Sequence, residues 1–367
     1  MSSLKFKPIP TLREPAELAA LGLVAVADVP NLQKVAARYA IAVTPEVAAL
    51  IDPDDPDDPI ARQYIPNAAE LVGQPNEKPD PIGDDVHSPV SGIVHRYPDR
   101  VLFKVVHVCA VYCRFCFRRE MVGPGKATAL SEGAYEDALT YIRAHSQIWE
   151  VILTGGDPLV LPPRSLHTVV CTLAAIDHVR IVRFHTRVPT VAPERITTDM
   201  VAALKAPGAA TYVALHANHP RELTPAARAA CGRIVDAGIP MLSQSVLLRG
   251  VNDDIATLTE LMRAFVACRI KPYYLHHADL APGTSHLRTS IEQGQELMRQ
   301  LRARASGLCL PDYMLDIPGG AGKVPVGPSY ISANAAAGEG AHLVRAHDGA
   351  VHAYPPSVTS PTRSPRI

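Results

Sequence analysis

The chain has 367 residues with 36 basic and 36 acidic side chains, so its formal net charge is zero. This balance argues against a general nucleic-acid binder and against a protein held at membranes by a polybasic surface. Seven cysteines, a low and odd number, exclude a disulfide scaffold and favour a reducing, cytoplasmic location. A hydrophobic content of 47% suffices for one barrel-sized domain or two smaller ones.

The N-terminal segment allows two interpretations. No stretch reaches the roughly 18 apolar residues that a membrane-spanning helix needs, so no membrane association is expected. The apolar run Leu18–Ala27 follows basic residues and ends in Ala-Val-Ala, as a secretory signal peptide does. The acidic residues Glu14 and Glu17 adjoin the run, however, and favour an ordinary N-terminal helix.

Composition divides the chain into three parts. Prolines and aspartates are concentrated between Ile51 and Pro89, where they break helices and leave turn-rich backbone. We therefore expect residues 1–90 to form a helical N-terminal region and a wrapping arm, and residues 91–330 to form the core. Residues 331–367 are expected to be a C-terminal extension that is partly disordered, because its end is rich in Pro, Ser, Thr and Arg.

After residue 100, short apolar runs alternate with helical patterns. Five consecutive runs start at residues 149, 179, 211, 240 and 270, about 30 residues apart, which is the length of a βα unit. The predicted strands are Val101–Val108, Trp149–Leu153, Val179–Phe184, Thr211–Leu215, Pro240–Leu247, Ile270–Leu275 and Tyr313–Ile317. The predicted helices are Ala134–Ala144, Pro225–Ala237, Ile255–Ala267 and Ile291–Ala305. Six or seven parallel βα units indicate an α/β fold, a partial TIM-like barrel.

Polar or glycine-rich clusters follow nearly every predicted strand. They include Gly155-Gly156-Asp157, His185-Thr186-Arg187 and the glycine-rich segment Pro318–Lys323. The carboxyl ends of barrel strands meet at one face, where active sites are built. Loops are polar in general, which explains hydrophilicity but not the recurrence of Cys, His and Asp at strand ends. The pattern therefore predicts one functional site at this face.

Three of the seven cysteines form the motif Cys109-x3-Cys113-x2-Cys116 directly after the first predicted strand. Three thiolates suit a soft metal or an iron–sulfur cluster. A structural zinc site would need a fourth ligand, and none lies at the usual spacing. Three ligands on a four-iron cluster leave one iron open, and an open iron can chelate the amino and carboxylate groups of S-adenosylmethionine (SAM).

This motif, with Phe115 before its last cysteine, resembles that of the radical SAM superfamily. The string from Cys109 to Arg119 resembles the lysine 2,3-aminomutase family in particular. Segments 95–100, 154–159, 244–252 and 318–323 resemble further motifs of that family, in the same order along the chain. The resemblance extends over most of the chain and implies a (β/α)6 barrel with a [4Fe-4S] cluster, SAM and pyridoxal 5′-phosphate.

The resemblance also assigns residues to the cluster and to SAM. Cys109, Cys113 and Cys116 would hold the cluster. Gly155, Gly156 and Asp157 match the motif that lies against the methionyl amino group of SAM; glycines allow close backbone approach, and an acid suits an ammonium neighbour. His216 and Gln244 match positions that contact the cosubstrate. The alternative for each is a hydrogen-bonded barrel residue.

Lys323 matches the lysine that binds pyridoxal phosphate as a Schiff base, and the glycines around it would give the aldehyde access. A phosphate-binding P-loop is excluded because Val324 follows the lysine and Ile317 stands at the position of the first P-loop glycine. A flexible loop without function remains an alternative. Arg96 and Arg100 match arginines near the cofactor phosphate; the alternative is a solvated charged turn.

Three residues bear on the substrate. Arg118 matches the family's arginine that binds the substrate α-carboxylate. An arginine suits this role better than a lysine because its guanidinium group can form two hydrogen bonds to one carboxylate. The alternative is that Arg118 is an ordinary surface arginine. Asp279 and Asp316 match two aspartates that bind the distal ammonium of lysine. Two carboxylates in one dry site repel each other unless a cation joins them. The pair therefore favours free L-lysine, unless both are cap or loop residues.

The other cysteines, Cys171, Cys231, Cys268 and Cys309, are expected to be small buried apolar residues. Better-known members of the family carry a zinc site that includes a cysteine at the position of Asp254 and a C-terminal cysteine cluster. Here no cysteine follows Cys309. We therefore expect no zinc.

Together, the resemblance implies an isomerase that converts L-lysine to β-lysine with a 5′-deoxyadenosyl radical. A reductant such as flavodoxin or ferredoxin would reduce the cluster, and a homo-oligomer is expected. One alternative is a sibling aminomutase that acts on another amino acid or on a lysine of a translation factor. The other is an electron-transfer or binding protein, which would need a fourth protein ligand for its cluster.

Overall fold

The computed structural model describes residues 10–122, 126–334, 340–346 and 348–355. Its main element is a nine-stranded sheet in which the strands follow their order in the chain. Strands β2 to β8 are parallel, and the edge strands β1 and β9 are antiparallel to their neighbours. The strands are β1 (Ile93–Tyr97), β2 (Arg100–Val106), β3 (Glu150–Gly155), β4 (Ile181–Thr186), β5 (Ala210–His216), β6 (Met241–Leu247), β7 (Ile270–His277), β8 (Asp312–Ile317) and β9 (Gly322–Pro325).

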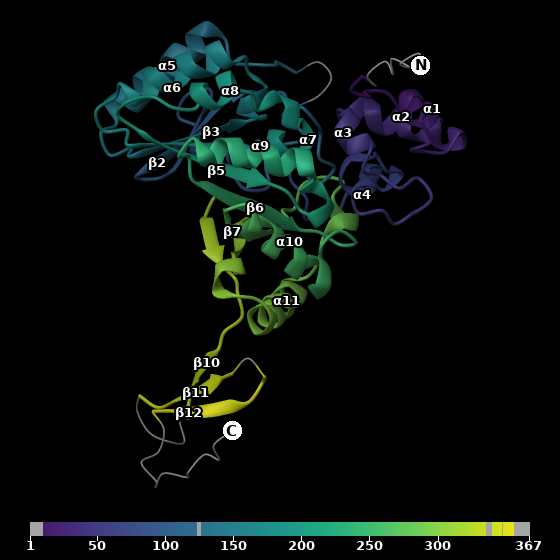
Figure 1. The fold of residues 1–367 in the computed structure, drawn as a ribbon, viewed down its shortest axis with the longest axis vertical. Coiled ribbons are helices and arrows are strands. Elements are labelled where there is room, and N and C mark those ends of the chain that lie inside the picture. The colour runs from purple at the N-terminus through teal and green to yellow at the C-terminus, as the bar shows by residue number, and fades with distance from the viewer. Residues whose placement is uncertain (1–9, 123–125, 335–339, 347, 356–367) are drawn as a thin grey trace, which may run out of the picture.

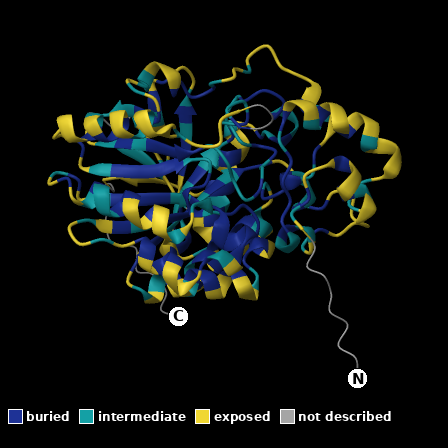
Figure 2. Cartoon of the chain, turned by 90° about the horizontal axis from the view of Figure 1, so that it is seen from above, coloured by how far each residue is buried: buried dark blue, intermediate teal, exposed yellow. Residues whose placement is uncertain are grey.

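Helices connect the parallel strands and cover the outside of the sheet (Figures 1 and 2). They are α5 (Glu132–Ala144), α6 (Pro163–Ala174), α7 (Val188–Val191), α8 (Thr198–Ala203), α9 (Pro225–Asp236), α10 (Ile255–Ala267) and α11 (Ile291–Arg304). Six βα units therefore precede β8. The predicted α/β barrel of the (β/α)6 type is confirmed, and each strand and helix predicted after residue 100 lies within two residues of its observed bounds.

The apolar periodicity of the sequence explains these elements. In α10, Leu258, Leu261, Met262 and Phe265 recur at helical spacing, and all four are fully buried. In β2, the alternating residues Val101, Phe103 and Val105 belong to the large core between the sheet and the helices. The intervening side chains of β2 therefore face the inside of the barrel.

The sheet curls until its two edges meet. The backbone N–H of Lys323 in β9 donates to the Tyr97 hydroxyl at the end of β1, at 2.7 Å. Gly322 precedes Lys323 with φ +110°, a backbone conformation that favours glycine. This hydrogen bond brings β1 and β9, the two edge strands of the sheet, together beside Lys323.

The N-terminal region is helical, as expected, and lies on one side of the barrel (Figure 1). Its α-helices are α1 (Pro15–Ala20), α2 (Val29–Arg38), α3 (Pro45–Ala48) and α4 (Ala61–Tyr64), and its short 3₁₀ helices are η1 (Val26–Asp28), η2 (Ala68–Leu71) and η3 (Asp85–His87). The run Leu18–Ala27 is not one helix, because Gly22 adopts φ +72° just after α1.

A buried carboxylate fixes the arm of this region to the segment that carries the cysteines. Glu70 receives two hydrogen bonds from Arg114 Nε, at 2.9 and 3.1 Å, and one from its Nη2 at 2.5 Å. Arg119 Nη2 also donates to Glu70, and the Arg119 guanidinium lies 3.5 Å from the centre of the Tyr39 ring. The arm thus determines where the segment around Cys113 and Cys116 lies.

The C-terminal part contains a small antiparallel sheet that was not predicted. It consists of β10 (Ile331–Ala333), β11 (His342–Arg345) and β12 (Val351–Tyr354) and projects away from the barrel (Figure 1). The expected disorder beyond Pro355 concerns residues 356–367, which lie outside the described residues. Within the described ranges, no helix has the length and apolar character to cross a bilayer.

We predict that Glu70→Ala lowers the free energy of unfolding by about 3–5 kcal/mol, because it leaves two buried guanidinium groups without their carboxylate. Urea titration of the purified chain measures the change. Glu296→Ala is the matched control, since it removes an exposed pair with Arg299 on α11 and should cost less than about 1 kcal/mol. Similar small losses in both variants would contradict the role given to Glu70.

Candidate functional site

The three cysteines of the motif lie together in the loop after β2. All three are free thiols; Cys113 and Cys116 raise the pKa of Cys109, and Cys116 also raises the pKa of Cys113. Burial is the main cause of the raised pKa of all three thiols, and it raises the pKa of Cys113 to about 11. Among the described residues, no three His, Cys, Asp or Glu side chains are arranged to hold a single metal ion. Three thiols that each bind a different iron of a cluster need no such convergence.

The glycine motif after β3 packs against this loop. Gly155 has φ +113°, and a Cβ there would lie 2.3 Å from the Val106 carbonyl oxygen. A Cβ on Gly156 would lie 2.1 Å from the Val108 carbonyl oxygen. The Gly156 N–H donates to the Val106 carbonyl at 2.6 Å. Both glycines are therefore required for the close contact between β3 and the residues before Cys109.

Asp157 is buried and already has several hydrogen-bond partners. Its carboxylate accepts from the Thr186 hydroxyl at 2.7 Å, from the Arg187 N–H at 2.7 Å and from the Leu159 N–H at 3.0 Å. Burial raises its pKa. These bonds fix the backbone of Arg187, which follows β4. The predicted nearness of Asp157 to the methionyl amino group remains a prediction.

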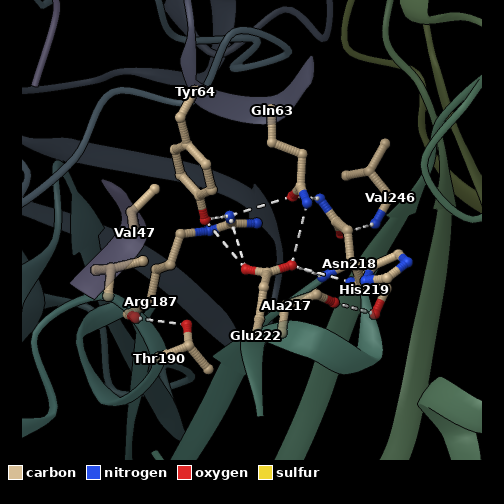
Figure 3. Close-up of polar contacts among 12 residues, drawn as sticks. Val47, Gln63, Tyr64, Arg187, Thr190, Ala217, Asn218, His219, Glu222 and Val246 are labelled. Carbon is tan, nitrogen blue, oxygen red and sulfur yellow. Dashed lines mark hydrogen bonds and ion pairs between the residues drawn. The ribbon is translucent and has the colours of Figure 1, made fainter. Parts of the chain in front are cut away.

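Arg187 belongs to a buried polar network that sequence reasoning did not find (Figure 3). Its Nη1 donates to the Tyr64 hydroxyl and lies 3.3 Å from Glu222 Oε2. Glu222 in turn accepts from the N–H groups of Asn218 and His219, at 2.7 and 2.9 Å. Tyr64 comes from α4, so the network joins the N-terminal region to the ends of β4 and β5.

Two nitrogen atoms of Arg187, Nε and Nη2, are buried and have no hydrogen-bond partner within the described ranges. The guanidinium lies 5.3 Å from the Phe115 ring centre and opposes the rise in the Cys113 pKa. Burial lowers the pKa of the neighbouring His216 well below its ordinary value, and Arg187 adds to this effect. His216 Nε2 is also buried without a partner in the described part of the chain. These atoms are unsatisfied donors or acceptors beside the cysteines.

His216 and Gln244 are neighbours in the barrel, and their contact with the cosubstrate remains a prediction. They are register partners on β5 and β6. Gln244 Nε2 lies 3.4 Å from His185 Nε2 on β4. Burial lowers the pKa of His185 well below its ordinary value, and the charges of Arg183, Arg118, His276 and Lys323 add to this effect. The barrel interior between the cysteines and Lys323 is therefore lined by uncharged imidazole and amide groups.

Lys323 and Asp316 are register partners on β9 and β8 and form an ion pair in which Asp316 is buried and Lys323 half-buried. Lys323 Nζ also lies 3.2 Å from His276 Nδ1 on β7. Burial alone would raise the pKa of Asp316, but its contact with His276 and the Lys323 charge hold it well below its usual range. Burial lowers the pKa of His276, with Lys323 acting in the same direction. An ionised carboxylate and a neutral imidazole thus flank the lysine amine.

Arg118 and Arg96 converge on a carboxylate that was not predicted, Asp84 of the N-terminal arm. Arg118 donates to Asp84 Oδ2 from Nη2 at 2.8 Å and from Nε at 3.0 Å. Arg96 Nη2 donates to the Ile82 carbonyl at 2.6 Å and to Asp84 Oδ1 at 3.3 Å, and its Nη1 lies 3.7 Å from Asp316. Burial would raise the pKa of Asp84, but Arg118 lowers it. Both arginines therefore border the Lys323 site.

Asp279 follows β7 and lies near Asp316 and Lys323, whose charges act on it. Burial and the Asp316 charge raise its pKa to about 7, whereas Lys323 and Arg118 oppose the rise. The structure therefore brings Asp279, Asp316, Arg118 and Lys323 together. Arg100 pairs with Asp99 at 2.7 Å and lies 3.9 Å from the centre of the Tyr97 ring, whose hydroxyl accepts from the Lys323 N–H; its place near the cofactor phosphate remains a prediction.

The remaining cysteines follow the expectation with one exception. Cys231, Cys268 and Cys309 are buried, but Cys171 is half-buried and its Sγ lies 3.4 Å from His167 Nε2 on the outside of α6. Asp254 accepts hydrogen bonds from the Ala256 and Thr257 N–H groups, at 3.0 and 2.9 Å, and so caps α10. The expected absence of zinc remains a prediction.

Sequence reasoning missed three charged residues of the site. Lys104 interrupts an apolar stretch of its strand, and this pattern could have indicated a charged residue inside the barrel. Arg187 lies in a polar cluster at a strand end, which is a weaker indication because such clusters are common in loops. Asp84 is one of eight aspartates between residues 51 and 90, and nothing local distinguishes it.

Comparisons with known proteins agree with this geometry. The sequence profile of the radical SAM superfamily matches residues 103–262, and a profile named lysine-2,3-aminomutase matches residues 298–364. The L-lysine 2,3-aminomutase of Clostridium subterminale is 42% identical over 291 residues, which cover 79% of this chain and 70% of that protein.

Two further proteins are similar to this chain. The glutamate 2,3-aminomutase of Clostridioides difficile is 36% identical over 300 residues, 82% of this chain and 70% of that protein. A solved radical SAM methyltransferase from Sphaerobacter thermophilus superposes with a TM-score of 0.42 at 23% identity, over 61% of this chain and 68% of that one.

Proposed function

Because the chain belongs to the lysine 2,3-aminomutase family of radical SAM enzymes, we propose that it converts free L-lysine to β-lysine with the help of pyridoxal phosphate. The family establishes an isomerase with an aminomutase reaction. Substrate identity is the open point, since a glutamate aminomutase is also similar. The observation that carries the proposal is that Asp316 pairs with Lys323 and lies near enough to Asp279 for the Asp316 charge to raise the Asp279 pKa.

The buried donors fit the expected cofactors. When bound, the reduced cluster and SAM supply a 5′-deoxyadenosyl radical that removes and returns hydrogen, and pyridoxal phosphate carries the migrating nitrogen. Cys109, Cys113 and Cys116 would bind the cluster. The free nitrogens of Arg187 and His216 suit the carboxylate and polar groups of SAM. Arg96 has a buried Nε without a partner in the described residues, which suits a phosphate near Lys323.

The residues around Lys323 prepare its amine. A protonated amine is not a nucleophile, so Lys323 Nζ must lose a proton before it can bind a carbonyl group. His276 Nδ1 is 3.2 Å away, and burial lowers the pKa of His276, so its ring is uncharged and can accept a hydrogen bond from the lysine amine. Once Lys323 is uncharged, Asp316 loses its ammonium partner and becomes available to a second ammonium group.

The two carboxylates discriminate between substrates by charge. The ε-ammonium of lysine can pair with Asp279 and Asp316 and relieve their mutual repulsion. A distal carboxylate, as in glutamate, would add a third negative charge at the same place and is disfavoured. Lysine is therefore favoured over a sibling reaction on an acidic amino acid.

A cleft beside the cysteine loop supports the expectation of a protein reductant. It has a volume of about 580 Å³ and is bordered by Arg13, Lys126, His107 and Tyr112. Within the described ranges, neither Arg13 nor Lys126 has a carboxylate within 4 Å. Such cations suit an acidic electron carrier such as ferredoxin or flavodoxin. The reduced cluster also agrees with the reducing, cytoplasmic location expected from the cysteines.

The C-terminal sheet supports the expected homo-oligomer. Ile331, Val351 and Tyr354 of β10 and β12 are each more than half exposed. A three-stranded sheet this small gains little from its own packing. A second copy of the chain would cover these apolar side chains.

The reaction is tested with anaerobically purified, reconstituted enzyme that is incubated with L-lysine, SAM and dithionite. We expect mass spectrometry of derivatised products to detect β-lysine. Lys323→Ala should abolish product formation, because no other amine occupies its place between Asp316 and His276. Lys205→Ala, which removes an exposed lysine, is the control and should retain full activity. Full activity of Lys323→Ala would show that the assignment of Lys323 is wrong.

Lysine binding should weaken at acidic pH. Asp279 has a pKa of about 7, so it is increasingly protonated below that pH and can no longer pair with an ammonium group. We expect the dissociation constant of L-lysine to rise by roughly tenfold per pH unit below about pH 7, as measured by calorimetry. Asp279→Asn should bind lysine weakly at all these pH values. A pH-independent affinity in the unmodified enzyme would contradict the role of Asp279.

A further inference from the structure

Arg187 is a buried cation with more hydrogen-bonding capacity than its partners use. Its side chain is 6% exposed. Its Nη1 donates to the Tyr64 hydroxyl and lies 3.3 Å from Glu222 Oε2 and 3.4 Å from Gln63 Oε1, so all three partners meet a single nitrogen. Nε and Nη2 are buried and have no partner among the described residues. Buried donors without partners are costly, which indicates that a bound group completes them.

The network around Arg187 is attached to the cysteine loop (Figure 3). Gln63 links the two directly: its side-chain Oε1 contacts Arg187 Nη1, and its backbone carbonyl accepts from the Arg114 N–H at 2.8 Å. Arg114 is the residue after Cys113. The next residue is Phe115, whose ring centre lies 5.3 Å from Arg187 Cζ. The guanidinium is therefore fixed against the segment between the second and third cysteines of the motif.

The packing of Cys113 places it on the same side chains. Cys113 packs against the apolar cluster that contains Tyr64 and against the one that contains Phe115. Arg187 Cζ lies 5.3 Å from the ring centres of both Tyr64 and Phe115. Burial raises the pKa of Cys113, and the Arg187 charge opposes this rise whereas Glu222 adds to it. Arg187 and Glu222 therefore act on Cys113 in opposite directions.

Arg187 is less neutralised than the other cations of this region. The arginines of the loop each bind a buried carboxylate, namely Arg114 and Arg119 on Glu70, and Arg118 on Asp84. Within the described ranges, Glu222 supplies the only carboxylate within 4 Å of the Arg187 guanidinium. Glu222 also accepts hydrogen bonds from the N–H groups of Asn218 and His219 and from Tyr64. Its negative charge is thus shared among several donors, and Arg187 keeps a positive field.

A positive field beside a cysteine ligand has a direct consequence for an iron–sulfur cluster. Reduction by one electron adds one negative charge to the cluster and leaves the protein charges unchanged. A nearby buried cation stabilises the added charge, and a buried carboxylate destabilises it. The reduction potential of such a cluster depends on these charges and on hydrogen bonds to its sulfur atoms.

We infer that the charge of Arg187 raises the reduction potential of the cluster that Cys109, Cys113 and Cys116 would bind, and that Glu222 limits this rise. The inference rests on the cluster of the proposed function and adds the residues that determine how readily the cluster accepts its electron. Because both Nε and Nη2 are free, this role is compatible with a contact between Arg187 and SAM.

The test measures the midpoint potential of the cluster in the reconstituted full-length chain, without SAM or lysine. Redox titration followed by electron paramagnetic resonance gives this value. We expect Arg187→Met to make one-electron reduction less favourable by about tenfold or more, which lowers the midpoint potential by about 59 mV or more. Arg187→Lys keeps the charge and should lower the potential less. Glu222→Gln removes the opposing charge with little change of shape and should raise the potential.

Shifts of opposite sign separate an electrostatic role from a structural one, because a loosened cysteine loop would move both variants in the same direction. Arg299→Met removes an exposed arginine of α11 and should leave the potential unchanged. If Arg187→Met binds no cluster, Glu222→Gln decides alone. An unchanged potential in either loaded variant, or shifts of the same sign in both, would overturn the inference. Since the assay contains no lysine, opposite shifts in a chain that forms no β-lysine would support the inference while the proposed function fails.

Discussion

The half-buried ion pair between Asp316 and Lys323 is the interaction on which the site depends. It joins β8 and β9 at the point where Tyr97 closes the sheet from the opposite edge. Arg96, His276 and Asp279 are all placed around it. In the proposed reaction, the Asp316 carboxylate would hold the Lys323 amine first and a substrate ammonium once that amine is engaged.

Two further buried networks hold the cysteine loop on either side. Glu70 binds Arg114 and Arg119, and Glu222 contacts Arg187 beside Cys113. Both networks use residues of the N-terminal region, which therefore has a role in the site and is more than a cover. Such fixed positions matter for radical chemistry, because a reactive intermediate must meet its substrate before it meets solvent.

The sequence predicted the parts of the fold that have a local signal. The strands and helices of the barrel follow from apolar periodicity. The cysteine motif and the glycines around Lys323 are short sequence motifs whose residue types indicate their chemistry. The C-terminal sheet has no such signal, because its strands are largely exposed and show no alternation of buried and exposed positions. The helix predicted across Leu18–Ala27 failed because Gly22 ends it early.

Charged partners were the least predictable feature of the site. Arg118 was expected to be free for a carboxylate, but Asp84, 34 residues away, occupies two of its nitrogens. Glu222 and Tyr64 meet Arg187 although they are 158 residues apart in the chain. Such pairs arise from the closure of the barrel and the path of the arm, and no pattern within a short window encodes them.

The central claim is that the α-amino group of lysine migrates to Cβ within one cavity. Incubating the reconstituted enzyme with L-lysine labelled with ¹⁵N only at the α-amino group tests this most directly. The account predicts that nuclear magnetic resonance detects the label bonded to Cβ of the product, with the ε-nitrogen unlabelled. A label that remains on Cα, or that is released as ammonia, would contradict it.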